Sequence, residues 1–597
     1  MIFTTRPEIR GTFGVAASTH WIVSAVAMGI MERGGNAFDA AVAGAFALHA
    51  VEPHLNGPAG ECPILFHSAA LGQTQVVCGQ GVAPQAATVA AFTDQGMDMI
   101  PGSGMIAAVV PGAFDAWLVL LRDHGTMALE DVWAPAIGYL EQGHPLLPGA
   151  ARALAEVAGA LTHEWPTGAD VWLPGGAAPH PGALFRNPAL AATWQRILRE
   201  AGPHGSREAR IDRARAVWSQ GFVADAIDRF FHAEPLLDAS GERHFGLLTG
   251  QDMAQWQATY EDSVSHQFMG WTVHKTGPWG QGPVLLQALA ILDGVGLSGD
   301  DLETADGIHV VLEAMKLAFG DREAYYGDPH FVDVPLAHLL SPEYNAQRRA
   351  MIGQDASQAV TPGIVPGFEQ QVAAALAQVR PARPSAGGLG VGEPTMMHLQ
   401  PTIKPRDTVH LDVADRWGNM VSATPSGGWP QSSPTIPGLG FAMNTRAQMF
   451  WLEPGLPGTL APGKRPRTTL TPTLAECGDR RLVCGTPGGD QQDQWQLQLL
   501  LRHLVGGLGL QRSIDMPLYH SLHFPASFYP RQALLGVAVL EESFGPEIIA
   551  DLRRRGHDVQ VAPAWSAGRL TAVGRDADGI LSGAATPRLM QAYAVGR

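Results

Sequence analysis

Cysteine is scarce in this chain. Its 597 residues include four, Cys62, Cys78, Cys477 and Cys484, and no two of them form a Cys-x-x-Cys pair. A zinc knuckle needs such pairs, and a disulfide scaffold needs a much higher density of cysteine. We therefore expect the four thiols to be small buried hydrophobic side chains.

An excess of basic residues is also missing. Lys and Arg together number 40 against 56 Asp and Glu, which gives a formal net charge of -16. This balance excludes general nucleic-acid binding and leaves no basic stripe for a membrane surface. It indicates no substrate, because acidity at this level mainly favours solubility.

Long apolar runs are absent. No stretch reaches the roughly 18 uninterrupted apolar residues that a membrane-spanning helix requires, and the opening "MIFTTRPEIRGTFGV" lacks the apolar core of a signal peptide. Hydrophobic residues nevertheless make up 46% of the chain. These features predict a globular cytoplasmic protein with a large core or several ordinary domains.

Helical patterns dominate the first part of the chain. Residues 20–53, "HWIVSAVAMGIMERGGNAFDAAVAGAFALHAVEP", predict two helices that are separated at Gly34 and Gly35. Asn36 can cap the second helix, which is apolar on every side and should be fully buried. Residues 111–350 are also mostly helical in pattern, with a short strand near 270–277.

The pattern changes after residue 351. Residues 352–407 are rich in Pro, Gly and Ala, which predicts a flexible linker. Hairpins are predicted over 408–424, 468–489 and 568–585, with a helix over 490–507. Helices beside antiparallel hairpins indicate a layered α+β fold.

The linker ends at a threonine. From Thr408 onward polar and apolar residues alternate, as in a half-buried strand that begins at this residue. A threonine hydroxyl can become a nucleophile if its own α-amine takes its proton, which requires that the chain be cut before it. Attack of the Thr408 hydroxyl on the carbonyl of Asp407 would make that cut. Thr402 is a rival cleavage position, but no alternation of polar and apolar residues follows it. The alternative interpretation of Thr408 is an ordinary threonine that begins a strand.

Six motifs follow one another along the chain: "GGNAFDAAVA", "VVPGAFDAW", "GDREAYYGDP", "TVHLDVADRWGNMVSAT", "GKRPRTTLTPTL" and "GTPGG". In this order they resemble the γ-glutamyltranspeptidase family of N-terminal-nucleophile hydrolases over nearly the whole chain. The resemblance implies a four-layer αββα sandwich and self-cleavage between Asp407 and Thr408. It implies a heterodimer of a large subunit, 1–407, and a small subunit, 408–597, which can assemble further.

The resemblance also implies site residues. Thr408 is the expected nucleophile and base, and Ser426 the hydroxyl that supports its amine. Gly488 and Gly489 are the expected backbone donors to the oxyanion, a role that suits a tight turn with converging N–H groups. Without the resemblance, "TPGG" would be an ordinary turn and Ser426 a loop serine.

The substrate-binding positions depart from the family pattern. Gln80 replaces the arginine that holds an α-carboxylate in the family, and Met449 replaces the acid that holds the α-amine. Arg446 adds a positive charge nearby, or is a structural salt-bridge arginine. Thr468 and Thr469 keep the hydroxyls of the family's paired serines. Val409 and Gly428 are further departures.

These departures favour an amidohydrolase that acts on a small acyl amide with a carboxylate and without an α-amine, such as an oxamate-, succinyl- or glutaryl-like compound. The alternatives are a true glutathione hydrolase or γ-glutamyltransferase, and an unprocessed relative with a binding role. Residues 450–464 are short compared with family members that carry a lid, which favours hydrolysis over transfer.

No metal or organic cofactor is expected, because the proposed chemistry needs none. His520 and His523 are three residues apart, yet no carboxylate lies at ligand spacing, so a core or interface pair is expected. The glycine-rich run 387–392 has no strand before it and is not expected to bind phosphate.

Overall fold

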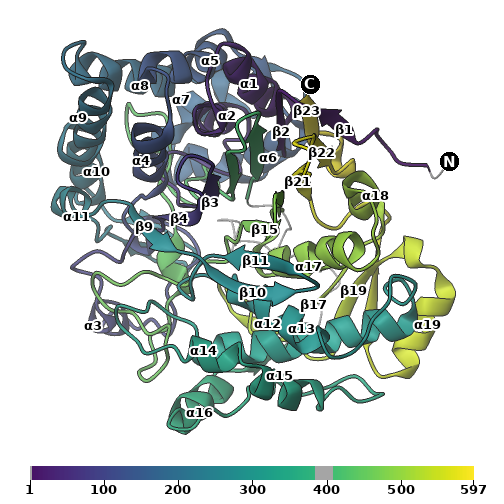
Figure 1. Ribbon diagram of the computed structural model, residues 1–597. Helices are drawn as coiled ribbons and strands as arrows, with labels where there is room; N and C mark the ends of the chain where they lie inside the picture. Colours follow the sequence, from purple (N-terminus) through teal and green to yellow (C-terminus); the bar gives the residue numbers. More distant parts are fainter. Residues whose placement is uncertain (1–2, 383–407) are drawn as a thin grey trace.

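Two seven-stranded antiparallel sheets form the centre of the computed structural model, which describes residues 3–382 and 408–597 (Figure 1). The first sheet has the order β23(Tyr593–Gly596), β2(Gly14–Ser18), β13(Leu411–Asp415), β14(Met420–Ala423), β3(Cys62–Ser68), β4(Gln73–Gly79), β9(Thr259–Asp262). The second has the order β1(Ile9–Gly11), β22(Leu581–Ala585), β21(Thr571–Arg575), β16(Arg480–Gly485), β15(Thr473–Cys477), β11(Trp271–Lys275), β10(Val264–Phe268).

Both sheets combine strands from before and after Thr408. In the first sheet β13 lies between β2 and β14, and Val413 pairs with Ala16 on one side and Val421 on the other. In the second sheet β15 pairs with β11. A cut before Thr408 would therefore leave two chains that share two continuous sheets and one set of cores.

The two sheets pack face to face through a small apolar cluster. Val15 and Ala17 of β2 belong to this cluster, together with Leu474 and Val483 of the second sheet. Ala16, between them, points to the opposite face, where the helices lie. This alternation follows from the two-residue period of a strand.

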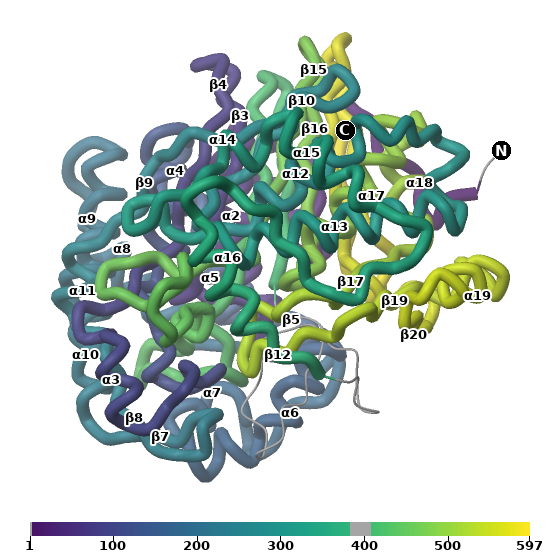
Figure 2. Tube along the Cα trace, turned by 90° about the horizontal axis from the view of Figure 1, so that it is seen from below, coloured from purple at the N-terminus to yellow at the C-terminus, as the bar shows by residue number. Residues whose placement is uncertain are grey.

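Helices cover the outer face of each sheet. Outside the first sheet lie α1(Trp21–Glu32), α2(Ala37–Val51), α4(Ala113–His124), α5(Leu129–Gln142), α8(Pro188–Ala201) and α9(Arg207–Gln220). Outside the second lie α12(Pro283–Leu292), α13(Ala305–Tyr325) and α17(Gln492–Leu504). In both views α8 and α9 lie on one side of the molecule and α17 on the other (Figures 1 and 2).

The two predicted N-terminal helices are confirmed. Every residue of α2 is buried, and Asn36 begins it with a capping box, in which its side chain accepts from the Asp39 N–H and Asp39 accepts from the Asn36 N–H. This cap satisfies N–H groups that would otherwise be unbonded in the core. The predicted hairpins are present as β13–β14, β15–β16 and β21–β22.

Shorter elements complete the fold. The remaining helices are α3(Val89–Thr93), α6(Pro148–His163), α7(Ala169–Trp172), α10(Phe222–Phe231), α11(Gly250–Gln255), α14(Leu336–Leu339), α15(Pro342–Arg349), α16(Glu369–Ala377), α18(Leu510–Asp515) and α19(Pro546–Arg554). A three-stranded sheet contains β17(Tyr519–Ser521), β19(Val537–Glu541) and β20(Asp558–Ala562). Three strand pairs join β12(Arg380–Pro381) to β18(Gln532–Ala533), β5(His144–Pro145) to β6(Leu184–Phe185), and β7(Leu236–Leu237) to β8(Arg243–His244).

The flexible linker predicted over 352–407 begins too early in the chain. Residues 352–382 contain α16 and β12, and Val372 and Ala375 of α16 are buried in the core outside the second sheet. This short apolar face was hidden by the surrounding Pro and Gly. Residues 383–407, which include Thr402, Asp407 and the glycine-rich run 387–392, lie outside the described residues.

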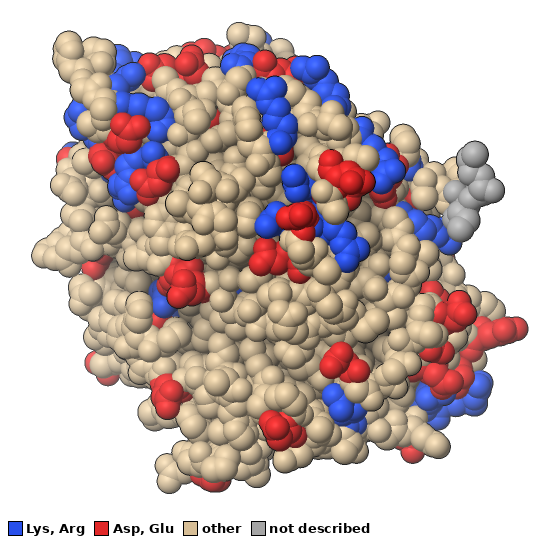
Figure 3. Space-filling model, viewed as in Figure 1, with Lys and Arg blue, Asp and Glu red and all other residues tan. Residues whose placement is uncertain are grey.

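No helix in the described part of the chain is long and apolar enough to cross a bilayer. On the face shown in Figure 3, basic and acidic side chains are interspersed.

Candidate active site

Thr408 lies at the open end of the β13–β14 hairpin. It forms an isolated antiparallel bridge with Ser426, and regular pairing of β13 begins at Leu411. The two hydroxyl oxygens, Thr408 Oγ1 and Ser426 Oγ, are 3.1 Å apart. Thr408 itself is 1% exposed. The structure therefore brings the predicted nucleophile and its predicted hydroxyl partner into direct contact.

The polar face of β13 is held by a buried network below Thr408. His410 Nδ1 lies 2.9 Å from Thr424 Oγ1, and His410 Nε2 lies 3.0 Å from Asp412 Oδ1. Ser422 donates to the same Asp412 oxygen at 2.8 Å. Buried polar groups are retained when they are hydrogen-bonded, and such a network fixes the strand that carries Thr408.

An ion pair that the sequence analysis missed holds the Thr408 carbonyl. The Arg569 guanidinium donates to this oxygen, and its Nη1 lies 3.3 Å from Glu52 Oε1. Glu52 also accepts from Thr19 Oγ1 at 2.7 Å and from Gln591 Nε2 at 2.6 Å. An acidic residue directly after the mostly apolar, fully buried helix α2 was the available signal, because such a buried acid needs a partner.

Gly488 and Gly489 form the turn between β16 and α17. Their φ angles are +134° and +55°. A Cβ on Gly488 would lie 2.3 Å from the Trp495 ring, and one on Gly489 would lie 2.9 Å from the Phe528 ring. Among the described residues neither N–H donates a hydrogen bond. The turn thus requires glycine and presents two backbone donors at the start of a helix, which suits an anion.

This turn lies beside the Thr408 end of the hairpin. A Cβ on Gly485, the last residue of β16, would be 2.1 Å from the His410 ring. Thr486 Oγ1 accepts from the N–H of Arg569 at 2.8 Å, and Arg569 contacts Thr408. Residues from three segments therefore converge on the predicted nucleophile.

Thr468 and Thr469 lie against the same turn. Thr468 donates its N–H to Trp279 O at 2.9 Å and accepts from Gln281 N at 3.0 Å. Gln281 Nε2 in turn donates to Gly489 O at 3.2 Å. The Thr469 hydroxyl is buried and has no hydrogen-bond partner among the described residues, which is unusual unless a ligand or water supplies one.

Arg446 is paired with a carboxylate that the sequence analysis did not single out. Its Nε donates to Glu61 Oε1, and both side chains are almost completely buried. Glu61 also forms a backbone bridge with Ser426, with N–H···O distances of 2.9 and 3.0 Å in the two directions. The ion pair is thus anchored beside the two hydroxyl groups. A structural salt bridge was one of the two expectations for Arg446. The residues around Glu61, "GPAGECP", give no local sign that this acid is the partner.

Phe528 connects Arg446 to the glycine turn. The Arg446 guanidinium carbon is 5.8 Å from the Phe528 ring centre and 5.7 Å from that of Trp429. The edge of the Phe528 ring also blocks the space above Gly489. Aromatic faces stabilise a desolvated cation, so this side chain joins the charged and the backbone-donor parts of the site.

Gln80 follows β4 and is completely buried. Its Nε2 donates to Gly81 O at 3.2 Å, and its side-chain oxygen has no partner among the described residues. The contacts of Gln80 do not reach Arg446 or Thr408 directly. Met449 is buried at the end of the 3-10 turn that begins at Arg446, so no carboxylate stands at that position.

Other polar clusters lie apart from these residues. His520 packs edge-on against Trp495, and its ring nitrogens have no partner in the described chain, while His523 Nδ1 accepts from Gly536 N at 2.7 Å. Both side chains are buried, as expected for core residues.

One group of side chains among the described residues has metal-ligand spacing: His309, Glu313 and His557. Lys316 Nζ lies 2.7 Å from Glu313 Oε1 and already neutralises this carboxylate. His309 Nδ1 lies 2.9 Å from His557 Nε2, a buried polar contact between α13 and the residue before β20.

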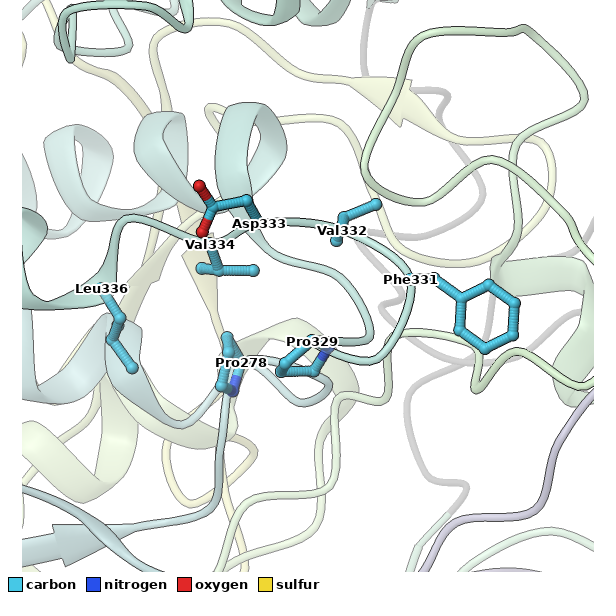
Figure 4. A pocket seen from close by; sticks show the side chains of 7 residues that line it. All are labelled: Pro278, Pro329, Phe331, Val332, Asp333, Val334 and Leu336. Carbon is cyan, nitrogen blue, oxygen red and sulfur yellow. The ribbon is translucent and has the colours of Figure 1, made fainter.

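An open hollow of about 580 Å³ lies against the loop that connects α13 to α14 (Figure 4). Its lining residues are Pro278, Pro329, Phe331, Val332, Asp333, Val334 and Leu336. None of the candidate site residues lines it. Pro278 precedes Trp279, whose carbonyl accepts from Thr468, so the hollow adjoins the threonine side of the site.

Comparison with known proteins identifies the class and the family of this enzyme. The chain belongs to the family described as gamma-glutamyltranspeptidase, whose family model matches residues 23–596. It is therefore an amidohydrolase or transferase of the N-terminal-nucleophile type.

Two curated relatives illustrate the range of the family. The oxamate amidohydrolase proenzyme of Klebsiella pneumoniae subsp. pneumoniae is 31% identical over 598 residues, which cover 97% of each chain. The glutathione hydrolase proenzyme of Bacillus subtilis is 27% identical, over 93% of this chain and 86% of the relative.

Solved structures show the same fold. LmbA2991T421A is 53% identical with full coverage of both chains and a TM-score of 0.92. Cephalosporin acylase from Bacillus halodurans is 28% identical with a TM-score of 0.82, over 100% of this chain and 97% of that chain. The mixed helix and sheet architecture is thus that of N-terminal-nucleophile hydrolases.

Proposed function

We propose that this protein is a self-processing amidohydrolase that cleaves a small acyl amide through an acyl-threonine intermediate on Thr408. The observation that carries the proposal is the contact between the Thr408 and Ser426 hydroxyls, 3.1 Å apart, at the end of a buried hairpin. The proenzyme names of the curated relatives support processing. The finer fold is a four-layer αββα sandwich, which the three apolar cores between successive layers support.

Maturation needs one internal acyl shift. Thr408 Oγ attacks the carbonyl carbon of Asp407, and the C–N bond breaks as the ester forms, which frees the α-amine of Thr408. Water then hydrolyses the ester to give the Asp407 carboxylate and the Thr408 hydroxyl. The products are residues 1–407 and 408–597, which remain together because both sheets contain strands from each.

Catalysis then uses the same hydroxyl. The α-amine of Thr408 takes the hydroxyl proton as Oγ attacks the substrate carbonyl. The N–H groups of Gly488 and Gly489 stabilise the oxyanion, a type of contact typically worth about 10²–10³ in rate. The amine leaving group receives the proton, and water attacks the ester with the α-amine again as base.

The substrate side favours an acidic acyl group. Arg446 is a buried guanidinium beside Phe528, and guanidinium groups bind carboxylates through two parallel hydrogen bonds. The pair with Glu61 does not prevent this, because one guanidinium can serve two carboxylates, as Arg322 serves Glu323 and Asp490 in this protein. Thr468, Thr469 and Gln80 are proposed to add neutral hydrogen bonds.

Glu61 favours a second candidate, a glutathione hydrolase or γ-glutamyltransferase. Its carboxylate, next to Ser426, is an anionic partner for an α-amine that Met449 cannot hold. The B. subtilis relative carries this activity in its name. The choice between the two functions therefore depends on whether Glu61 only supports Arg446 or also binds an ammonium group.

Two substrates that differ only in the α-amine decide the question. Glutaryl-p-nitroanilide and γ-glutamyl-p-nitroanilide are compared after intact-mass analysis has established two fragments, the smaller beginning Thr-Val-His-Leu. The first function predicts a higher kcat/KM for the glutaryl compound, and the second predicts the reverse. Oxamate and succinamate extend the test to shorter acids. A chain that is neither cleaved nor active on these substrates would leave only the third alternative, an unprocessed relative with a binding role.

Variants connect the result to the site. Arg446→Met should lower kcat/KM for the glutaryl substrate about 10- to 100-fold, the loss of one charged hydrogen-bond pair. Glu61→Gln should reduce turnover of the γ-glutamyl substrate more than that of the glutaryl substrate only if Glu61 binds the ammonium. Thr408→Ala is the control and should remain one uncleaved chain.

A further inference from the structure

The Arg569–Glu52 pair stands directly behind the nucleophile. Arg569 lies just before β21 and is 3% exposed, and Glu52 ends α2 and is fully buried. One terminal nitrogen of the guanidinium, Nη2, donates to the carbonyl oxygen of Thr408, and the other, Nη1, lies 3.3 Å from Glu52 Oε1. The cation therefore touches Thr408 directly, and the carboxylate is bonded to the cation.

Other contacts hold this order in place. Arg569 donates its backbone N–H to Thr486, two residues before Gly488. Glu52 is fixed by Thr19 and Gln591. A buried ion pair is generally no more stabilising than apolar side chains of the same volume. Its presence at the reacting residue is better explained by an action on Thr408 than by stability.

A residue's carbonyl and α-amine share one Cα. Covalent geometry therefore puts a cation on the Thr408 carbonyl within about 6 Å of the Thr408 nitrogen. An α-amino group ordinarily titrates near 7.7–8.0, so about nine-tenths of it is protonated at pH 7 and cannot accept a proton. A nearby positive charge disfavours the ammonium form.

We propose that Arg569 and Glu52 are a positioning pair for Thr408, in which Arg569 orients the carbonyl and keeps the α-amine in the neutral form that accepts the hydroxyl proton. Glu52 holds Arg569 and moderates its charge. This inference rests on the proposed role of Thr408 as an N-terminal nucleophile.

Other charged groups face Thr408 from every side, and each has a partner. On β13, Asp412 is bonded to His410, Ser422 and Thr571. Next to Ser426, Glu61 is paired with Arg446. At the start of α1, burial, followed by His144 and Arg569, lowers the pKa of His20 to about 3, so this ring is neutral. Within residues 3–382 and 408–597, Arg569 is a charged group that donates directly to the Thr408 carbonyl.

The test is the pH dependence of kcat/KM in mature protein, where the acidic limb reports the α-amine. Arg569→Met should move this limb to higher pH by about one unit, and Glu52→Gln should move it to lower pH by about half a unit, as expected for charges at these separations. Arg569→Lys keeps the charge and should leave the limb near its wild-type position. Shifts in opposite directions from the two halves of one pair cannot come from a general loosening of the fold.

Intact mass is recorded for each variant first. If Arg569→Met is not cleaved, the other two variants still provide the test. The acidic limb of kcat/KM should then move to lower pH in Glu52→Gln and stay near its wild-type position in Arg569→Lys. Cleaved, active variants whose limbs stay at the wild-type pH, or move in the same direction, would overturn the inference and leave the proposed function intact. A wild-type chain without a Thr408 N-terminus would overturn both.

Discussion

Alanine at Gly488 would test the glycine turn on which the oxyanion proposal depends. The φ angle of +134° is one that L side chains rarely adopt, and the new Cβ would lie 2.3 Å from Trp495 Cζ3. The backbone strain costs about 1–2 kcal/mol. Overpacking against a ring adds about 1–3 kcal/mol. The free energy of unfolding should fall by the sum, about 2–5 kcal/mol.

Gly438→Ala is the matched control. Gly438 has a φ of +74° and nothing within 4 Å of an added Cβ. In Gly438→Ala the free energy of unfolding should fall only by the backbone strain, about 1–2 kcal/mol. Both variants gain the same stability from a less flexible unfolded chain. The difference between the two contains the Trp495 contact, about 1–3 kcal/mol, and the extra strain of an alanine at φ +134° compared with +74°.

Urea unfolding and turnover of the best anilide substrate measure the two effects. Movement of one N–H away from the oxyanion should lower kcat about 100-fold or more in Gly488→Ala, with little change in Gly438→Ala. Equal stabilities and equal turnover in the two variants would show that the turn is neither tightly packed nor used in catalysis.

Two further predictions concern stability. Lys275 Nζ and Asp493 Oδ1 form a fully buried ion pair at 3.0 Å. Lys275→Met should lower the free energy of unfolding by about 3–5 kcal/mol, and the double variant Lys275→Met with Asp493→Leu should recover most of this loss. Equal losses for the single and the double variant in chemical denaturation would contradict this prediction. Burial lowers the pKa of His49 to about 3. Between its unfolded value and pH 3 the unfolded chain binds a proton that the folded chain does not, so stability falls with falling pH by about 1.4 kcal/mol per unit. His49→Leu should remove this contribution from the slope between pH 6 and 4, and an unchanged slope would refute it.

Local patterns were sufficient for the elements around the site. The alternation after Thr408 predicted the hairpin, although regular pairing begins only at Leu411. The Asn36 cap and the apolar run after it predicted α2 with its start. Both signals come from hydrogen bonds and side-chain periods within a few residues. The α16 helix was missed because two buried side chains within a Pro- and Gly-rich stretch make too weak a pattern.

The sequence by itself determined the hairpin, the glycine turn, the threonine where polar alternation begins and, through its ordered motifs, the family. The tertiary structure alone decided what surrounds that threonine. Arg446 meets Glu61 across 385 positions, and Arg569 meets Thr408 across 161. Such contacts depend on which strand edges and helix ends the two sheets bring together. A residue's own neighbours in the chain carry no record of this, because burial of a charge selects a partner in space and not in sequence.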